Sequence, residues 1–174
     1  MITRIATFAL ALSAVLGTAA GQSPKAEAST TINGKKITIK YSAPSVRGRK
    51  IFGDGGVISK DPTYPVWRAG ANSATTLITE GDLDIGGLKV PKGTYTLFVL
   101  TSPTPWKLIV NKQTGQWGLS YDQGQDLGRV DMTMSKPAQP VETFKITLDG
   151  TGGSKGKLTM AWSDVSASVP ITVQ

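Results

Sequence analysis

The sequence predicts an all-β protein, a single antiparallel β-sandwich of about nine short strands in a jelly-roll-like or immunoglobulin-like arrangement. Strand-like segments recur at spacings of about ten residues, and glycine, proline or asparagine turns separate them. No segment shows the period of an amphipathic helix together with capping residues. Because closed sheets have a similar pattern, a β-barrel is the alternative.

The first twenty residues have the pattern of a secretory signal peptide. Arg4 precedes an apolar run from Ile5 to Leu16, and small residues follow, so we expect cleavage after Ala20. The run is shorter than the ~20 residues that a membrane span needs, although an N-terminal anchor is the alternative. We therefore expect export to the periplasm or the cell exterior. We also expect a flexible leader over residues 21–30 and one domain over 31–174 that does not span a membrane.

The expected strands follow from alternation and from β-branched and aromatic residues. Residues 31–42 come first, where Asn33-Gly34 signals a hairpin turn and apolar residues alternate with polar ones from Ile37 to Tyr41. The later strands are expected at 74–80, 82–85, 94–100, 106–112, 129–134, 141–149, 157–162 and 168–173. Trp106 and Trp162 lie within these patterns and are expected in the core.

Two long segments lack this periodicity. Residues 43–67 contain three prolines and four glycines, and residues 113–128 are rich in glycine and glutamine. Loops of such length are uncommon in compact domains and are often functional. We therefore expect these two loops to carry the functional surface.

The composition excludes several classes of chemistry. The chain has no cysteine and no histidine, so Ser-His-Asp and Cys-His catalysis and ordinary zinc, copper or haem sites lack their residues. Carboxylate, lysine or tyrosine chemistry and oxygen-bound cations stay open, but no calcium-loop or nucleotide-binding motif occurs. We therefore expect no cofactor and no metal, and we favour a protein that is not an enzyme.

The net charge of the chain limits the classes of partner that we expect. The net charge of +7, or +6 once Arg4 is removed, attracts anionic envelope polymers and phosphates, although solubility also explains it. The basic residues are spread along the chain without a nucleic-acid-binding motif, so nucleic acid is not an expected partner. The pattern gives no indication of an oligomeric state.

Six residues of the segments 44–72 and 113–129, which include most of the two loops, are candidates for binding a ligand. Arg68 either offers its donors to a carboxylate, a phosphate or sugar hydroxyls, or pins the loop to acceptors of the protein. In an extended chain Trp67 and Arg68 point to opposite faces, and Asn72 either contacts the ligand or shapes its own turn. Trp117 and Tyr121 either stack on sugars or plug the end of the sandwich. The full set is Arg49, Trp67, Arg68, Asn72, Trp117 and Tyr121.

Carboxylates supply an alternative function. A glycoside hydrolase needs two of them about 5–10 Å apart. No spacing singles out a pair among the four that we consider, which are Asp122, Asp126, Asp131 and Glu142. Glu142 alternates onto the apolar face of its strand, so we expect it to pair with Arg68 or Arg129, and Asp126 is a second acidic partner.

A series of unusual segments carries a resemblance. IKYSAPSVRGRKIFG, VWRAGANSAT, GGLKVPKGTYTLF and QWG occur in this order. With this series the chain resembles a family of exported bacterial proteins, domain of unknown function 2911, from around Ile39 to Val173. The resemblance implies a fold and no reaction. The chain departs from the family pattern at Ser73, where the pattern has Glu, and in the extended segment GDGGVISKDPTYPV before Trp67.

The sequence therefore predicts a non-catalytic binding or envelope-associated module. Its expected ligand is anionic or polyhydroxylated, such as an envelope glycan or another small anion. A carboxylate-dependent glycan hydrolase and a purely structural envelope protein are the alternatives. The structural alternative expects Arg68 to be paired inside the protein, whereas the binding module expects it at a ligand surface.

Overall fold

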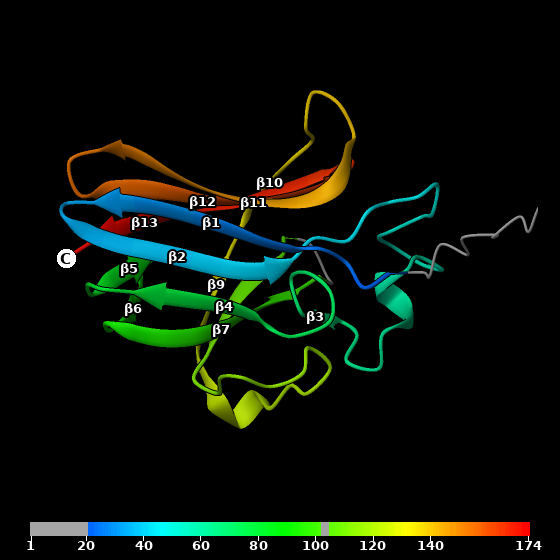
Figure 1. Ribbon diagram of the computed structural model, residues 1–174, viewed down its shortest axis with the longest axis horizontal. Coiled ribbons are helices and arrows are strands. Elements are labelled where there is room, and N and C mark those ends of the chain that lie inside the picture. The colour runs from blue at the N-terminus through cyan, green and yellow to red at the C-terminus, as the bar shows by residue number, and fades with distance from the viewer. Residues whose placement is uncertain (1–20, 102–104) are drawn as a thin grey trace, which may run out of the picture.

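The computed structural model describes residues 21–101 and 105–174, which form two antiparallel sheets packed face to face (Figure 1). The sheets stay separate and do not close into a barrel, so the predicted β-sandwich is confirmed. The expected signal peptide, residues 1–20, lies outside the described residues. In the described part of the chain, no helix has the length and apolar character that crossing a membrane requires.

The first sheet has the strand order β1-β2-β4-β7-β8-β9, and β3 also pairs with β7. Its strands are β1 (Lys25–Ile32), β2 (Lys35–Ser42), β3 (Val66–Trp67), β4 (Thr75–Thr79), β7 (Gly93–Leu100), β8 (Lys107–Asn111) and β9 (Asp126–Asp131). The strands expected at 74–80, 94–100 and 106–112 therefore become three adjacent members of this sheet.

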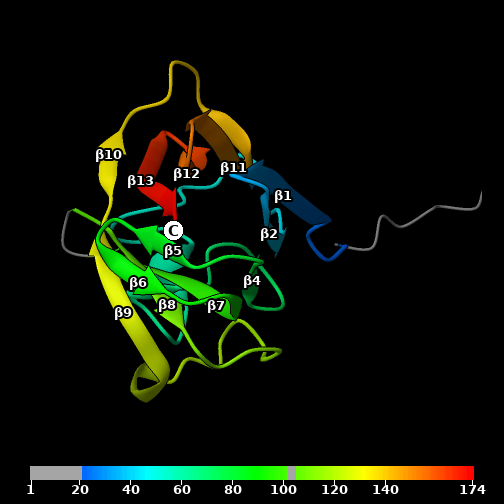
Figure 2. The same ribbon diagram turned by 90° about the vertical axis from the view of Figure 1, so that its left-hand side faces the viewer.

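The second sheet has the order β11-β12-β13-β5-β6, and β10 pairs with β13. Its strands are β5 (Leu83–Ile85), β6 (Leu88–Val90), β10 (Thr133–Ser135), β11 (Val141–Gly152), β12 (Lys155–Ser163) and β13 (Val165–Val173). The strand expected at 129–134 is divided between the sheets, because the chain crosses over at Met132, whose N–H donates to Trp106 O at 2.8 Å. Figure 2 shows this crossing from β9 to β10 along one side of the sandwich.

The first strand replaces part of the expected flexible leader. Residues 25–32 form β1 and pair with β2 along their whole length, and the predicted hairpin turn at Asn33-Gly34 is confirmed. Ala28 and Ile32 face the core, while the residues between them are polar or small. The small and polar composition of this segment predicts a flexible chain, but pairing with β2 satisfies the hydrogen-bonding groups of its backbone.

An aromatic cluster joins the two sheets. The indole of Trp67, from β3, stacks on that of Trp162, from β12, with ring centroids 5.8 Å apart and planes at 19°. Phe144 of β11 and Trp106 pack edge-on against Trp67. Trp106 and Trp162 are 6% and 2% exposed, so their predicted place in the core is confirmed.

The long loop 43–67 contributes to the core. At its start Val46 N donates to Glu142 O at 2.8 Å, which attaches the loop to the edge of β11. Farther along, Ile51 and Ile58 are buried, the latter in a short 3-10 helix, η1 (Ile58–Lys60). Much of this loop is therefore a structural cover.

A smaller apolar cluster lies on the outer face of the first sheet. Phe98 and Ile109, from β7 and β8, are fully buried there, while their chain neighbours point into the main core. The loop between β8 and β9, which contains the 3-10 helix η2 (Gln123–Gln125), covers them, and Tyr121 packs on Phe98 at 4.9 Å. The outer face is thus covered over β7 and β8.

Candidate functional site

The structure brings the ends of the two long loops together. Ser73 and Trp117 form an isolated antiparallel bridge. Ala74 N donates to Gln116 O at 3.2 Å, and Gly118 N donates to Asn72 O at 3.0 Å. We call residues 72–74 and 116–118 the Ser73–Trp117 junction. At this junction the turn that follows Trp67 and Arg68 therefore meets the loop 113–128.

Trp117 is the exposed tryptophan of this chain. Half of its surface is accessible, 50%, whereas the other three tryptophans are buried in the core. Residues directly opposite in an antiparallel pair have their side chains on the same face, so the indole lies beside Ser73. The junction holds the backbone of Trp117 while its ring faces solvent.

Beside the junction lies a hollow of about 550 Å³, which we call the β1–β2–β4 hollow. The residues that line it are Lys25, Ala26, Glu27, Lys40, Tyr41, Ser42, Ser73, Ala74 and Thr76. Most of them belong to the half of the outer face that the β8–β9 loop leaves uncovered. Ser73 belongs both to the hollow and to the junction.

The floor of the hollow carries free cations. Lys25 lies opposite Ser42, and Lys40 lies between Glu27 and Thr76 in the strand register. Within residues 21–101 and 105–174, neither lysine makes an ion pair. Cationic and hydroxyl groups therefore line this hollow together with the carboxylate of Glu27, and neither lysine is held in an ion pair.

Trp67 lies in the core rather than at a ligand surface. It is 1% exposed, and its Nε1 donates to Gly70 O at 3.1 Å. The expected opposition of neighbouring side chains holds, because Arg68 points away toward Asp61. Of the two roles that the sequence leaves open for Trp67, the structural one agrees with this burial.

Arg68 is paired inside the protein, which agrees with the structural alternative for this residue, and its partner is one that the sequence does not indicate. Its Nη2 lies 3.4 Å from Asp61 Oδ2, and both side chains are mostly buried. Its Nε is buried without a hydrogen-bond partner. The side chain also packs against Gly118, where a Cβ would overlap it. Burial raises the pKa of Asp61 more than the nearby Arg68 lowers it.

The expected pairing of Glu142 with Arg68 or Arg129 is wrong. Glu142 is exposed, and its Oε1 accepts a hydrogen bond from Arg47 N at 2.9 Å. The register of β11 against β12 shifts between Val141 and Lys145, which takes Glu142 off the buried face. The alternation that predicted a buried carboxylate therefore breaks at this irregularity.

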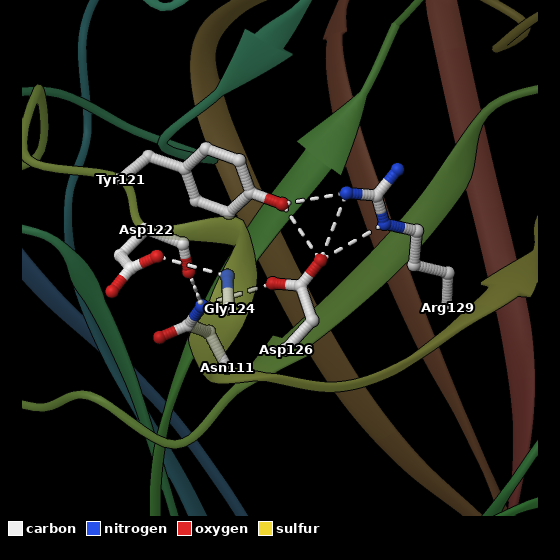
Figure 3. A network of polar contacts seen from close by, with 6 residues as sticks. All are labelled: Asn111, Tyr121, Asp122, Gly124, Asp126 and Arg129. Carbon is white, nitrogen blue, oxygen red and sulfur yellow. Dashed lines mark hydrogen bonds and ion pairs between the residues drawn. The ribbon is translucent and has the colours of Figure 1, made fainter.

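Tyr121 and Asp126 belong to a polar network at the base of the covering loop (Figure 3). The Tyr121 hydroxyl donates to Asp126 Oδ2 and accepts from Arg129 Nη2, both at 2.7 Å. Arg129 Nε also donates to Asp126, and Asn111 Nδ2 donates to the other Asp126 oxygen, each at 2.9 Å. Burial, followed by the bond to Asp126, raises the pKa of Tyr121 to about 12.

This network engages its polar groups internally. Three side chains bond Asp126, and the carboxylate of Asp122 accepts from Gly124 N at 2.8 Å within the same loop. Asp131 pairs with Lys107. The carboxylates that a hydrolase would use thus serve separate structural contacts.

Arg49 and Asn72 also make local contacts. Arg49 donates to Val46 O at 3.0 Å and to Ser45 O at 2.7 Å, so its guanidinium folds back on its own loop. It is not among the residues of the hollow. Asn72 has a φ of +60°, which agrees with the turn role, and its side-chain amide donates to Ser23 O at 3.4 Å.

Sequence reasoning missed the lysines and hydroxyls of the hollow. The alternation within β2 is a usable signal for Lys40 and Ser42, because it places them opposite the core-facing residues. Lys25 and Glu27 were assigned to the flexible leader and so escaped attention. In the part of the chain that the structure describes, no cluster of acidic residues could hold a metal ion.

Comparison with known proteins gives one match. A family model described as "Protein of unknown function (DUF2911)" matches residues 23–171. This range covers almost all of the described chain, including both sheets, the junction and the hollow. No curated protein and no solved structure shows a significant match.

Proposed function

The chain belongs to the DUF2911 family, whose function is unknown, and from its own residues we propose that it is a non-catalytic binding module for an anionic or polyhydroxylated ligand. The ligand site is the β1–β2–β4 hollow together with Trp117. The carrying observation is that the junction joins the backbone of the exposed Trp117 to Ser73, which lines this hollow.

An exposed tryptophan needs an explanation here. The core buries the three other tryptophans. Trp117 stays half exposed, so its large apolar surface contributes less to stability than a buried indole would. A flat aromatic face beside polar groups suits the apolar face of a sugar ring, whose hydroxyls then reach the polar side chains. Ser42, Ser73 and Thr76 supply hydroxyls within the hollow.

Unsatisfied polar atoms around the junction support the same place. Gln116 Nε2 and Arg68 Nε are both buried without a hydrogen-bond partner in the described structure. Gln116 belongs to the junction, and Arg68 packs against Gly118 of the junction. Such atoms are rare in native proteins, because leaving a buried donor unpaired costs about 1–3 kcal/mol. Their presence fits a segment kept for a purpose other than stability.

The proposed setting is the bacterial envelope. A signal-peptide pattern over residues 1–20 would export the protein to the periplasm or the cell exterior, where glycans are abundant. The net positive charge favours approach to anionic polymers in that setting.

Fluorescence quenching tests the proposal. Acrylamide reaches only exposed indoles, so in the purified domain it should quench Trp117 first. We expect saturating oligosaccharide to protect this indole from acrylamide, in a panel of acidic and neutral envelope oligosaccharides. Protection by no member of the panel would overturn the proposal.

Calorimetry with two matched variants locates the site. Trp117→Leu removes the exposed ring at the junction, whereas Tyr64→Leu removes the other large exposed apolar side chain, which is 41% accessible. We expect Trp117→Leu to weaken oligosaccharide binding by at least tenfold, of the order that loss of one stacked ring explains, about 1.4 kcal/mol. Tyr64→Leu should bind as the wild type does. Equal effects of the two variants would place the ligand elsewhere.

A further inference from the structure

We infer that the ligand of the hollow is an acidic saccharide, with its ring against Trp117 and its acidic group between Lys25 and Lys40. This inference rests on the proposed function and names the class of its ligand. It depends on the arrangement of charges along two adjacent strands.

The strand register sets these charges close together. Lys25 lies opposite Ser42, and Glu27 lies opposite Lys40, on strands β1 and β2. Lys25 and Lys40 are therefore diagonal neighbours on one face, about 7–8 Å apart at the Cα atoms, within reach of one carboxylate or phosphate for two flexible side chains.

Lys25 and Lys40 are distinguished from the other lysines because both line one hollow, whereas the lack of an ion pair is common among the lysines of the described chain. Lys89 pairs with Asp84 and Lys107 pairs with Asp131. In the described ranges 21–101 and 105–174, Lys25 and Lys40 have no such ion pair, although Glu27 lies across from Lys40. Two like charges on neighbouring positions repel each other. An anion bound between them relieves this repulsion.

Glu27 distinguishes a saccharide from a simple anion. Its carboxylate would repel phosphate, but it accepts hydrogen bonds from sugar hydroxyls. Lys40 lies between this acceptor and the hydroxyl of Thr76. A ligand that carries both an acidic group and free hydroxyls can bind the two lysines and also hydrogen-bond to Glu27 and Thr76. Inorganic phosphate finds complementary charge only at the lysines.

The hollow continues toward the indole. Ser73 lines the hollow and is bridged to Trp117, so the backbone of Trp117 lies next to the hollow, although Trp117 is not itself one of the lining residues. A volume of about 550 Å³ lies within the usual range for ligand sites. An oligosaccharide can therefore place one ring on the indole and the acidic group of a neighbouring position at the lysines.

The test measures binding of three probes to the purified domain by calorimetry. The probes are a uronic acid trisaccharide, a neutral hexose trisaccharide and inorganic phosphate. The variants are the double change Lys25→Gln with Lys40→Gln, the change Glu27→Gln, and as a control Lys145→Gln, an exposed lysine on β11.

The acidic trisaccharide should bind more tightly than the neutral one. We expect the double lysine variant to lose about tenfold in affinity for the acidic probe and to keep its affinity for the neutral probe. Glu27→Gln should raise the affinity for the acidic trisaccharide a few-fold, since it removes a charge that repels the acidic group. Lys145→Gln should change neither affinity. Added salt should weaken the binding of the acidic trisaccharide and leave that of the neutral one unchanged.

Each other outcome decides against part of the argument. Equal binding of both trisaccharides, unaffected by the lysine changes, overturns this inference and leaves the proposed function standing. Binding of phosphate as tight as that of the acidic trisaccharide also overturns it, because the hydroxyls and Glu27 would then have no role. Binding of neither trisaccharide, without protection of Trp117, overturns the proposed function as well.

Discussion

Asp61 carries a charge that its surroundings disfavour. Its side chain is mostly buried beside Arg68, and the 3.4 Å separation is long for a strong ion pair. Burial raises the pKa of Asp61 above its ordinary value of 3.8, and the attraction of Arg68 only partly offsets this effect. The folded protein therefore holds a proton on Asp61 at pH values where the unfolded chain has released it.

The sign of the resulting pH dependence is fixed by this shift. Stabilisation by protonated Asp61 is complete below the unfolded pKa and is lost as the pH rises through the higher, folded pKa. Asp61→Asn keeps the shape without the charge, so its stability relative to the wild type should rise over this window. Urea unfolding from about pH 3 to about pH 7, a range that begins below the ordinary carboxyl pKa of about 4 and ends well above it, measures the difference.

Asp149→Asn is the control for this experiment, because Asp149 is exposed on β11. Its stability difference from the wild type should change little over the same range. If Asp61→Asn instead loses stability relative to the wild type as the pH rises, the attraction of Arg68 outweighs burial and the argument fails.

The hydroxyl of Tyr121 joins two charged side chains. It donates to Asp126 and accepts from Arg129, both at 2.7 Å, as Figure 3 shows. Tyr121→Phe removes both bonds, and we expect the free energy of unfolding in urea at pH 7 to fall by about 1–2 kcal/mol. Tyr64→Phe changes an exposed tyrosine and should stay within about 0.5 kcal/mol of the wild type. Equal stability of Tyr121→Phe and the wild type would contradict a structural role for the network.

At this scale the sequence predicts single residues well where the pattern is regular. Trp106 and Trp162 lie in strong strand patterns and are buried as expected. Glu142 is predicted wrongly, because a register shift in β11 is a local deviation that alternation alone does not reveal. The pairing of Asp61 with Arg68 is not predicted, because the fold of loop 43–67 brings the two side chains together and no local pattern indicates that fold.

The strand β1 shows why an edge element is difficult to predict. Its outward positions are polar and its inward positions are partly small, so the segment has little net hydrophobicity. Only the pairing with β2 and the burial of Ile32, which is 4% exposed, identify it as part of the fold. Lys25, at the start of this strand, is one of the two lysines that line the hollow.

Truncation of Ile32 tests whether β1 contributes to stability. Its side chain lies over Gly150 and Gly156 of the second sheet, which closes the gap between β1 and β11. We expect Ile32→Ala to lower the free energy of unfolding by about 2–4 kcal/mol, because it leaves a cavity in a packed site. Thr31→Val changes an exposed position of the same strand and should have an effect below about 0.5 kcal/mol. A wild-type stability for Ile32→Ala would mean that β1 is detached, as a flexible leader would be.

The two long loops are predicted as functional and are in large part structural. Loop 43–67 buries Ile51 and Ile58, and the β8–β9 loop buries Phe98. The bridge between Ser73, in the turn that follows Trp67 and Arg68, and Trp117 of the β8–β9 loop joins residues far apart in the sequence, and no local pattern predicts such a contact. The candidate surface was therefore predictable as a pair of loops, but its floor on β1 and β2 was not.

The sandwich as a whole follows from local rules. Short alternating segments between turn residues leave each strand with one apolar face, and two sheets bury these faces against each other. Strand order and the crossing between sheets depend on non-local pairing, so the sequence predicts about nine strands where the described structure divides them further. The additional strands are β1 and the short β3, β6 and β10.

The aromatic cluster makes the two sheets one cooperative unit. Trp67 belongs to the first sheet and Trp162 to the second, and their rings stack at 5.8 Å. The near-ultraviolet circular dichroism of this pair reports contact between the sheets, while the far-ultraviolet signal reports the strands themselves. We expect both signals to follow one urea transition with the same midpoint, because neither sheet can keep its buried face in water alone.

The Trp117→Phe variant sharpens this measurement, since it removes the exposed indole and leaves three buried ones. Its fluorescence should then change in the same transition as both dichroism signals. Loss of the near-ultraviolet signal at a lower urea concentration than the far-ultraviolet signal would show that the sheets separate before they unfold. In that case the hollow, which lies on the first sheet, would persist after the aromatic contact is broken. Coincident curves would instead show that the two sheets unfold as one unit.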